Sequence, residues 1–419
     1  MSFQTGLSGL NASSQSLDVI GNNIANANTV GMKSSRGEFA DLVASAIGVG
    51  GLSNTAGIGT AVSSITQNFS QGNVNITGNS LDVAINGGGF YQLTKSDGTT
   101  AFSRAGQFKL DKDGNIITNS GAFLMGYPTD VAGNTTSFTT AKLSVPTGAP
   151  IAAKQTTTIS AEFNLDARAP KAATGTSATQ YGTSLTAYDS QGVATPVSLY
   201  FVKSAQDTWE AYDNVAGAQQ AVTDIANNVT PTGQVLTMNF NTNGSLLTPS
   251  TPQAITLSTP NQLIGAPLTP GKFTATIDVS KATQYGVSFA ISSLSQDGYT
   301  SGEFTGLSID NKGVITTRYS NGQTQKNGGM IALADFRNVQ GLEPIGNGEY
   351  QESYKSGAAV MGQPTVGRFG ELRAGAVEES NVDLTAELVN MMTAQRNYQA
   401  NAQTIKTQDQ IMSTLVNLR

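Results

Sequence analysis

The side chains that carry out most protein chemistry are scarce in this chain. Its 419 residues include no Cys and no His, which excludes thiol nucleophiles, disulfides, Ser-His-Asp triads and nearly all zinc sites. Carboxylates remain, and Glu303, Asp310, Asp335 and Glu343 could supply a glycosidase pair if two of them lay roughly 5 to 10 Å apart. Nothing in the sequence brings any two together. We therefore expect solvated loop positions, no catalytic residues and no enzyme.

Glycine and aspartate motifs could in principle hold a phosphate group or a metal ion. Residues 48–51 and 57–59 are glycine-rich, but neither has the third glycine of a dinucleotide fingerprint or the Lys-Ser/Thr of a phosphate loop. Residues 111–115 resemble part of a calcium loop, but the ligand spacing fails and no Glu stands at the twelfth position. We predict flexible loops at the first two motifs, a hairpin turn at the third, and no cofactor or metal site.

The composition excludes further classes of partner. Charged residues make up only 12% of the chain, where an ordinary globular domain has about 25%, and Asn, Gln, Ser and Thr supply the missing polarity. The net charge of −6 leaves no basic surface for nucleic acid or anionic lipid. The sequence has neither a membrane-spanning apolar run nor a cleavable secretory signal. We expect no nucleic-acid partner and no membrane insertion, although this composition is typical of extracellular bacterial surface proteins.

Both ends of the chain carry residues at alternating spacings of four and three, the pattern of a helical seam. A helix of this kind is stable only when its stripe is packed, and the simplest partner for each helix is the other one, in a coiled coil. Ser14, Gly21, Gln395 and Asp409 weaken the seam. The pair therefore either closes one monomer or is completed by further copies, and the weak seam favours oligomerisation. The expected polymerisation residues are Leu7, Leu10, Leu17, Ile24, Leu384, Leu388, Met391, Tyr398, Ile405, Met412 and Val416.

Between the two ends, short alternating runs separated by turn residues indicate antiparallel β domains. Asp97-Gly98 and Asp113-Gly114 are hairpin turns by sequence. The expected fold is mainly β, multidomain and elongated, with one β domain nested in another and paired terminal helices. The expected parts are terminal helices in 1–28 and 376–419, a connecting segment at 29–70, a first β domain of 71–145 and 286–375, and an inserted outer β domain at 146–285.

Several motifs resemble a known family. Residues 22–33, Asn-Asn-Ile-Ala-Asn-Ala-Asn-Thr-Val-Gly-Met-Lys, resemble the signature that opens the axial proteins of the bacterial flagellar rod and hook. Residues 394–409, which begin Ala-Gln-Arg-Asn-Tyr-Gln, resemble the hook branch in particular, and residues 87–90 and 102–108 are similar to its first β domain. The motif residues are Asn22, Asn23, Ala25, Asn26, Thr29, Gly31, Lys33, Gln395, Arg396 and Tyr398.

The resemblance implies a structural subunit that polymerises into the flagellar hook, the curved flexible tube that acts as a universal joint between rod and filament. It implies that the terminal helices form an inner core tube and that the β domains form outer layers. The implied partners are further copies of the chain, the flagellar rod, the hook cap, the hook-filament junction proteins and the type III export apparatus. Export without a cleaved signal peptide would place the protein outside the cell. The glycine-rich segments 48–59 and 71–89 are expected to act as hinges.

Other functions are compatible with the same residues. A distal rod subunit or a hook-associated subunit would share the terminal motifs. A surface adhesin would explain the Thr-rich middle of the chain, and a secreted carbohydrate-active enzyme would use the scattered carboxylates. Only the axial subunits require the terminal helices to assemble into tubes.

Overall fold

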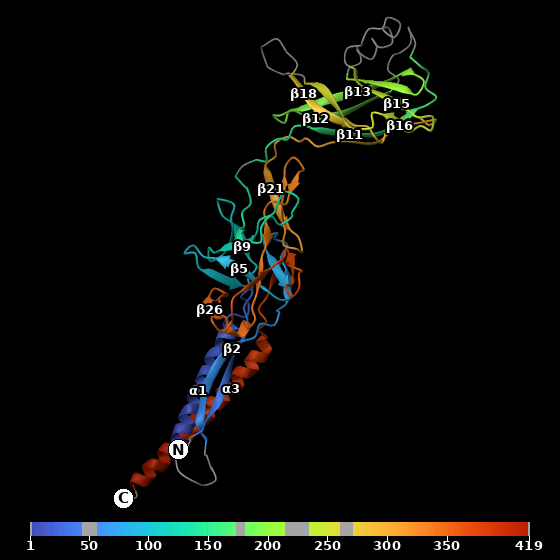
Figure 1. The fold of residues 1–419 in the computed structure, drawn as a ribbon. Helices are drawn as coiled ribbons and strands as arrows, with labels where there is room; N and C mark the ends of the chain where they lie inside the picture. Colours follow the sequence, from blue (N-terminus) through green and yellow to red (C-terminus); the bar gives the residue numbers. More distant parts are fainter. Residues whose placement is uncertain are drawn as a thin grey trace. The chain divides into compact units, whose positions relative to one another are not determined.

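The computed structural model describes residues 2–43, 57–148, 150–172, 181–213, 234–259 and 271–417. The chain divides into a first unit, formed by Met1–Gly148, Thr305–Arg318 and Thr324–Arg419, and an outer unit, formed by Ala149–Phe304 and Tyr319–Gln323. Most elements are β-strands, and each end of the chain contributes a helix (Figure 1). This confirms the predicted class, a mainly β multidomain fold with paired terminal helices. Within the described ranges, no helix has the length and apolarity needed to cross a membrane.

The terminal helices are α1 (Ser2–Ala25) and α3 (Leu384–Asn417). They lie side by side, and a hairpin of β1 (Ser35–Val43) and β2 (Gly57–Gln67) packs along α1 (Figure 1). The hairpin register pairs Ser35 with Gln67. The predicted connecting segment at 29–70 therefore contains an antiparallel pair of strands, β1 and β2, that packs against α1.

Some sequence predictions for this part need correction. Residues 57–59 begin β2 and are not a loop, whereas the predicted loop at 48–51 lies outside the described residues. The predicted C-terminal helical range begins too early, because Ala376–Glu378 forms β30. The helix starts at Leu384 because the Asp383 carboxylate accepts hydrogen bonds from the backbone N–H groups of Thr385 and Ala386, at 2.9 and 3.2 Å, which is the geometry of an N-cap.

The first unit is built around an antiparallel sheet whose central order is β26-β27-β6-β5-β9-β8-β7. Small pairs, β29 with β4 and β3 with β30, tie the C-terminal segment to the start of the domain. The strands are β3 (Val74–Ile76), β4 (Val83–Asn86), β5 (Phe90–Thr94), β6 (Thr100–Ser103), β7 (Phe108–Leu110), β8 (Ile116–Thr118), β9 (Phe123–Tyr127), β10 (Ala141–Lys142), β21 (Phe304–Ile309), β22 (Ile315–Tyr319), β23 (Thr324–Gln325), β24 (Met330–Ile331), β25 (Leu333–Asp335), β26 (Glu343–Gly346), β27 (Glu349–Gln351), β28 (Val360–Gly362), β29 (Glu371–Ala374) and β30 (Ala376–Glu378), with a short 3-10 helix η1 (Val339–Gly341).

Aromatic residues fill the core of this first unit beside the helices. Phe90 packs edge-on against Phe336 and Tyr350, with ring centroids 5.9 and 6.0 Å apart. Val83 and Ile85 of β4 are fully buried. The segment 71–89, which was predicted as a hinge, thus contains a strand fixed in the core.

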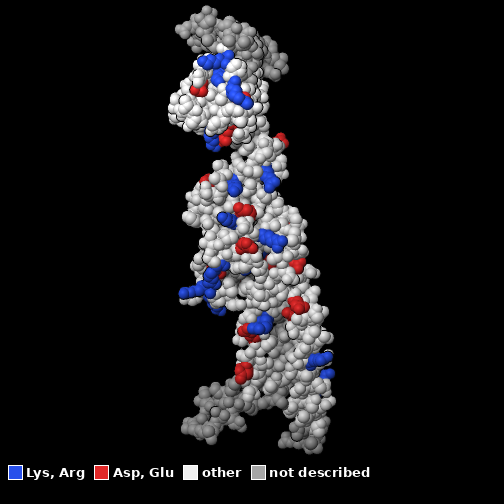
Figure 2. Space-filling model, turned by 90° about the vertical axis from the view of Figure 1, so that its right-hand side faces the viewer, with Lys and Arg blue, Asp and Glu red and all other residues white. Residues whose placement is uncertain are grey.

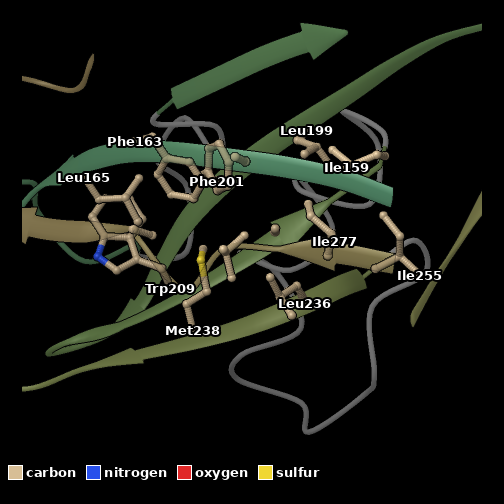
Figure 3. Packing of buried hydrophobic residues seen from close by; sticks show 14 of the residues in the cluster. Ile159, Phe163, Leu165, Leu199, Phe201, Trp209, Leu236, Met238, Ile255 and Ile277 are labelled. Carbon is tan, nitrogen blue, oxygen red and sulfur yellow. The ribbon is translucent and has the colours of Figure 1, made fainter. Parts of the chain in front are cut away.

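The outer unit is a sandwich of two sheets, one in the order β17-β18-β11-β19 with β20 beside β11, the other in the order β12-β13-β14-β15-β16. Trp209 and Phe201 are buried between the sheets, and Figure 3 shows Phe201 beside Phe163 of the facing sheet. The strands are β11 (Thr158–Asp166), β12 (Tyr181–Tyr188), β13 (Ala194–Ala205), β14 (Thr208–Tyr212), β15 (Gln234–Phe240), β16 (Leu246–Thr248), β17 (Gln253–Thr259), β18 (Gly271–Asp278), β19 (Thr283–Tyr285) and β20 (Ala290–Gln296).

The outer unit extends beyond the predicted boundary at 285. Strand β20 pairs antiparallel with β11, from Ile159 opposite Gln296 to Asn164 opposite Ala290. Because this pairing belongs to the sandwich, the unit continues to Phe304.

Asp297, just after β20, anchors the start of β11. Its carboxylate accepts hydrogen bonds from the Thr157 and Thr158 N–H groups, both at 2.8 Å, and pairs with Lys154 at 2.9 Å. Partial burial opposes ionisation, but a hydrogen bond from the Thr157 hydroxyl at 2.7 Å, together with these bonds, outweighs it and holds the pKa of the Asp297 carboxyl well below its ordinary value. Ionised Asp297 therefore stabilises the folded unit above the unfolded-state pKa of 3.8, and this contribution is lost as the pH falls below that value.

We predict that Asp297→Asn lowers the free energy of unfolding of the outer unit at neutral pH by about 1–3 kcal/mol and weakens its dependence on acid pH. Denaturant titration followed by the fluorescence of Trp209, the single Trp of the chain, measures both. The control is Asp278→Asn, because Asp278 bonds within its own turn to the Ser280 N–H group at 2.9 Å. Equal denaturant titration curves for the wild type and Asp297→Asn would contradict the stabilising role assigned to the Asp297 carboxylate.

Candidate functional site

The helix pair is the part of the molecule where the predicted polymerisation residues gather. Helices α1 and α3 run antiparallel, because Gly9 lies beside Asn401 and Asn23 donates to the Glu387 carboxylate at 3.1 Å. The contact is close: a Cβ atom on Gly9 would lie 2.9 Å from the Asn401 side chain. Ser13 also accepts a hydrogen bond from Asn401 at 3.5 Å. Small and polar side chains therefore hold the pair together within one chain.

The face that α3 turns toward α1 overlaps the predicted stripe only in part, at Ile405, which lies beside Gly6 of α1. Ala394 is buried, and Asn401 and Ile405 are half-buried, whereas Leu388 is 50% exposed. The pair therefore uses a face rotated away from much of the apolar stripe. Of the predicted polymerisation residues, Leu7, Leu384, Leu388, Tyr398 and Met412 are exposed, and Leu10, Leu17, Ile24, Met391 and Ile405 are half-buried, while the surroundings of the Val416 side chain lie outside the described residues.

Large apolar side chains therefore remain exposed on the helices and the adjoining hairpin. On α3, Leu388 and Met392 are neighbours at a spacing of four residues, and clustered exposed apolar surface of this kind marks an interaction site. Figure 2 shows that the face it displays carries only scattered charged groups over this part of the molecule. The exposed side chains are Phe3, Leu7, Phe39, Leu42, Ile65, Leu384, Leu388, Val389, Met392, Tyr398, Ile411 and Met412.

A buried ionic junction lies where the helices leave the first β domain. The Lys33 ammonium group donates to the Glu378 carboxylate at 2.5 Å, and both side chains are fully buried. Lys33 also donates to the Ser70 carbonyl at 2.7 Å. Arg104 donates to the other Glu378 oxygen at 3.1 Å, and the Gly72 N–H group donates to the first at 3.0 Å. Burial lowers the pKa of Lys33, and the Glu378 carboxylate offsets part of this effect.

Two further motif residues are fixed at this junction. Gly31 has φ of +72°, and a Cβ atom there would lie 2.5 Å from the Ala105 backbone nitrogen, so both conformation and space require glycine. Asn23 is buried and exchanges two hydrogen bonds with the Ser35 backbone, at 2.7 and 2.9 Å. The motif therefore connects the end of α1 to the hairpin and to the β domain.

The other N-terminal motif residues lie at the surface near the end of α1. Asn26 donates to the Asn22 carbonyl at 3.0 Å, and Thr29 donates to Asn26 at 3.3 Å. These three side chains line a cleft of about 660 Å³ whose walls include Ile65 and Pro344. The remaining motif residues, Ala25, Gln395 and Arg396, are exposed.

Four family models match consecutive parts of the chain. Their descriptions are flagella basal body rod protein (residues 3–33), flagellar hook protein FlgE/F/G D1 domain (84–164), flagellar basal body protein FlaE D2 domain (164–299) and flagellar basal body rod FlgEFG protein C-terminal (373–418). The flagellar hook protein FlgE of Escherichia coli strain K12 is 40% identical over 428 residues, and that of Salmonella typhimurium is 41% identical over 429. Both alignments cover the full length of both chains. The chain belongs to the flagellar hook protein family.

A solved hook-family structure shares the fold. The crystal structure of Helicobacter pylori flagellar hook protein FlgE2 superimposes with a TM-score of 0.50 at 15% sequence identity, covering 71% of this chain and 99% of that one. The relatives at 40% and 41% identity confirm the family resemblance predicted from the sequence. Hook proteins are structural subunits of the flagellum, and the two relatives named above align with this chain over its full length.

Sequence reasoning missed two features of this hook-family chain. It identified Gly31 and Lys33 through the motif, but it did not identify Glu378 and Arg104 as their partners. It also missed Gly9 at the helix contact. A glycine on the inward face of a helix, about one turn from a second one at Gly6, was the available signal for close helix packing.

We predict that Lys33→Met destabilises the first unit of this hook-family protein by about 3–5 kcal/mol, because it leaves Glu378 buried without its ammonium partner. Denaturant titration followed by far-ultraviolet circular dichroism measures the change. Lys112→Met, at an exposed lysine, is the matched control and should change stability by less than about 0.5 kcal/mol. If both variants unfolded at the same denaturant concentration, the junction would not have the role given to it here.

Proposed function

We propose that this chain is the structural subunit that polymerises into the flagellar hook, outside the cell. The observation that carries this proposal is the apolar surface left exposed on α3, with Leu388, Val389 and Met392 each about half exposed. The hook-family relatives, which match over their full length, favour the hook over the rod as the site of assembly.

The terminal helices would form the inner core of the tube, and the β units would form its outer layers. In a helical polymer each subunit makes the same heterologous contact with the next one, so the contact repeats without closing. The exposed stripe of α3 is suited to this role, since the opposite side of α3 is already occupied by α1. Helices of neighbouring copies would complete the seam that one chain leaves open.

Low surface charge suits a tube that bends while it rotates. Ion pairs between subunits would favour particular registers, whereas Ser, Thr and Asn can exchange hydrogen bonds with water at small net cost. In the described part of the outer unit, the ion pairs join residues of that same unit: Lys154 with Asp297, Arg168 with Asp166, and Lys281 with Glu162. These charges are therefore partly neutralised within the subunit and would not lock it to a neighbour.

The remaining partners follow from the position of a hook between rod and filament. The chain would contact the rod at one end of the tube and the hook-filament junction proteins at the other, and the hook cap during growth. It would pass through the type III export apparatus before assembly, without cleavage of a signal peptide.

We predict that Leu388→Asp blocks polymerisation and leaves the folded subunit intact, because the new carboxylate would be buried against a neighbouring copy. The critical concentration for tube formation should rise at least about tenfold, which corresponds to roughly 1.4 kcal/mol. Sedimentation and electron microscopy of the concentrated full chain measure assembly, and circular dichroism checks the fold.

Gln399→Asp is the matched control, since it places the same charge at an exposed polar position of the same helix. The critical concentration of Gln399→Asp should be closer to that of the wild type than the critical concentration of Leu388→Asp is. Tubes formed equally well by Leu388→Asp would exclude this face of α3 from the subunit contact, and failure of the wild type to form any tube would exclude the proposed function.

A further inference from the structure

The methionines of the chain are unequally exposed. Of the nine in the sequence, eight lie in the described part. Met238 is fully buried and Met330 is 8% exposed, whereas Met392 is 52% and Met412 is 54% exposed. Among the described methionines only these two are classed as exposed, and both lie on α3. Accessible thioether groups are thus concentrated on the helix proposed for assembly.

Met392 lies in the middle of the exposed apolar face. Leu388 and Val389 precede it by four and three residues, so their side chains are its neighbours on the helix surface, and both are about half exposed. Met412 adjoins Ile411, which is 48% exposed, on the part of α3 that continues past the start of α1 (Figure 1). A change in polarity at either sulfur would therefore alter the assembly face itself.

The chain offers oxidants no thiol, because it contains no Cys. Exposed methionine is then the most readily oxidised sulfur of the folded subunit. We infer that Met392 and Met412 are two oxidant-sensitive modification sites, and that their oxidation controls the assembly of free subunits. The control of assembly rests on the proposed function, whereas the preferential oxidation of these two residues does not.

The chemistry is a two-electron oxygen transfer from a peroxide. The thioether sulfur attacks one oxygen of hydrogen peroxide, and an S–O bond forms as the O–O bond breaks. The transferred oxygen loses its proton to the departing hydroxide, which leaves as water, so the sulfur is oxidised by two electrons and the peroxide is reduced. The product, methionine sulfoxide, is polar and chiral, and methionine sulfoxide reductases can reverse its formation. A sulfoxide buried at an apolar contact without a hydrogen-bond donor is unfavourable. Oxidation of the free subunit should therefore oppose polymerisation, and prior assembly should shield both sulfurs.

The test treats the purified, unassembled full chain with hydrogen peroxide and maps the oxidised methionines by mass spectrometry of peptides. We expect Met392 and Met412 to be oxidised at least about tenfold faster than Met238 and Met330. The critical concentration for tube formation should rise about tenfold after oxidation, and treatment of preformed tubes should oxidise the same residues more slowly.

The matched variant replaces both residues, Met392→Leu with Met412→Leu, and keeps the apolar face without its sulfurs. It should form tubes before and after peroxide treatment with the same critical concentration. Normal assembly of the wild type after complete oxidation at both positions would overturn the inference, and so would an equal loss of assembly in the double variant.

The oxidation rates are measured in the unassembled chain, so they decide the preferential-oxidation part whether or not tubes form. Equal rates at exposed and buried methionines would overturn it. If the untreated wild type formed no tubes, the proposed function would fail instead, and with it the control of assembly.

Discussion

The first unit depends on the burial of one ion pair, Lys33 with Glu378, whose partners are 345 residues apart in the sequence. A charge removed from water is stable only when it is paired and hydrogen-bonded. Arg104 adds a second cation beside Glu378, and the Ser70 carbonyl and the Gly72 N–H group each add a hydrogen bond to the pair. These groups come from the segment after α1, the loop after the hairpin, the β domain and β30. The chain cannot satisfy them unless all four segments meet at one point.

This constraint sets where both helices leave the β domain. Residue Lys33 follows α1 by eight residues and Glu378 precedes α3 by six, so the two helices begin their contact close to the junction. The Asn23 side chain then links α1 to both the hairpin and Glu387 of α3. Close packing at Gly9 carries the contact further along the pair. The free subunit can therefore keep its helices paired without using most of its large apolar side chains.

The sequence predicted those features of the fold that depend on residues close together in the chain. It did not predict the features that depend on contacts between residues far apart in the chain. The Asp97-Gly98 and Asp113-Gly114 turns follow from short-range hydrogen bonding, and both are present, with positive φ at each glycine. The rotation of α3 was missed because heptad spacing weights all apolar positions equally, while the inward face is built from Ala394 and Asn401. The boundary at 285 was misplaced because β20 is rich in Ser and is recognised as a strand only through its pairing with β11.

The arrangement of polarity on the helices explains how weak contacts could give a stable tube. In a monomeric protein, a helix normally turns its large apolar side chains inward. Here Leu388, Val389 and Met392 are half exposed, so burying the rest of each would contribute only about 1 kcal/mol. Association of two proteins costs an estimated 4–15 kcal/mol in lost freedom of motion. A single contact along this stripe is therefore too weak to persist. In the proposed tube, a copy that touches several neighbours at once would bury the stripe, the hairpin residues and the ends of both helices together, so stable addition would require an existing tube end.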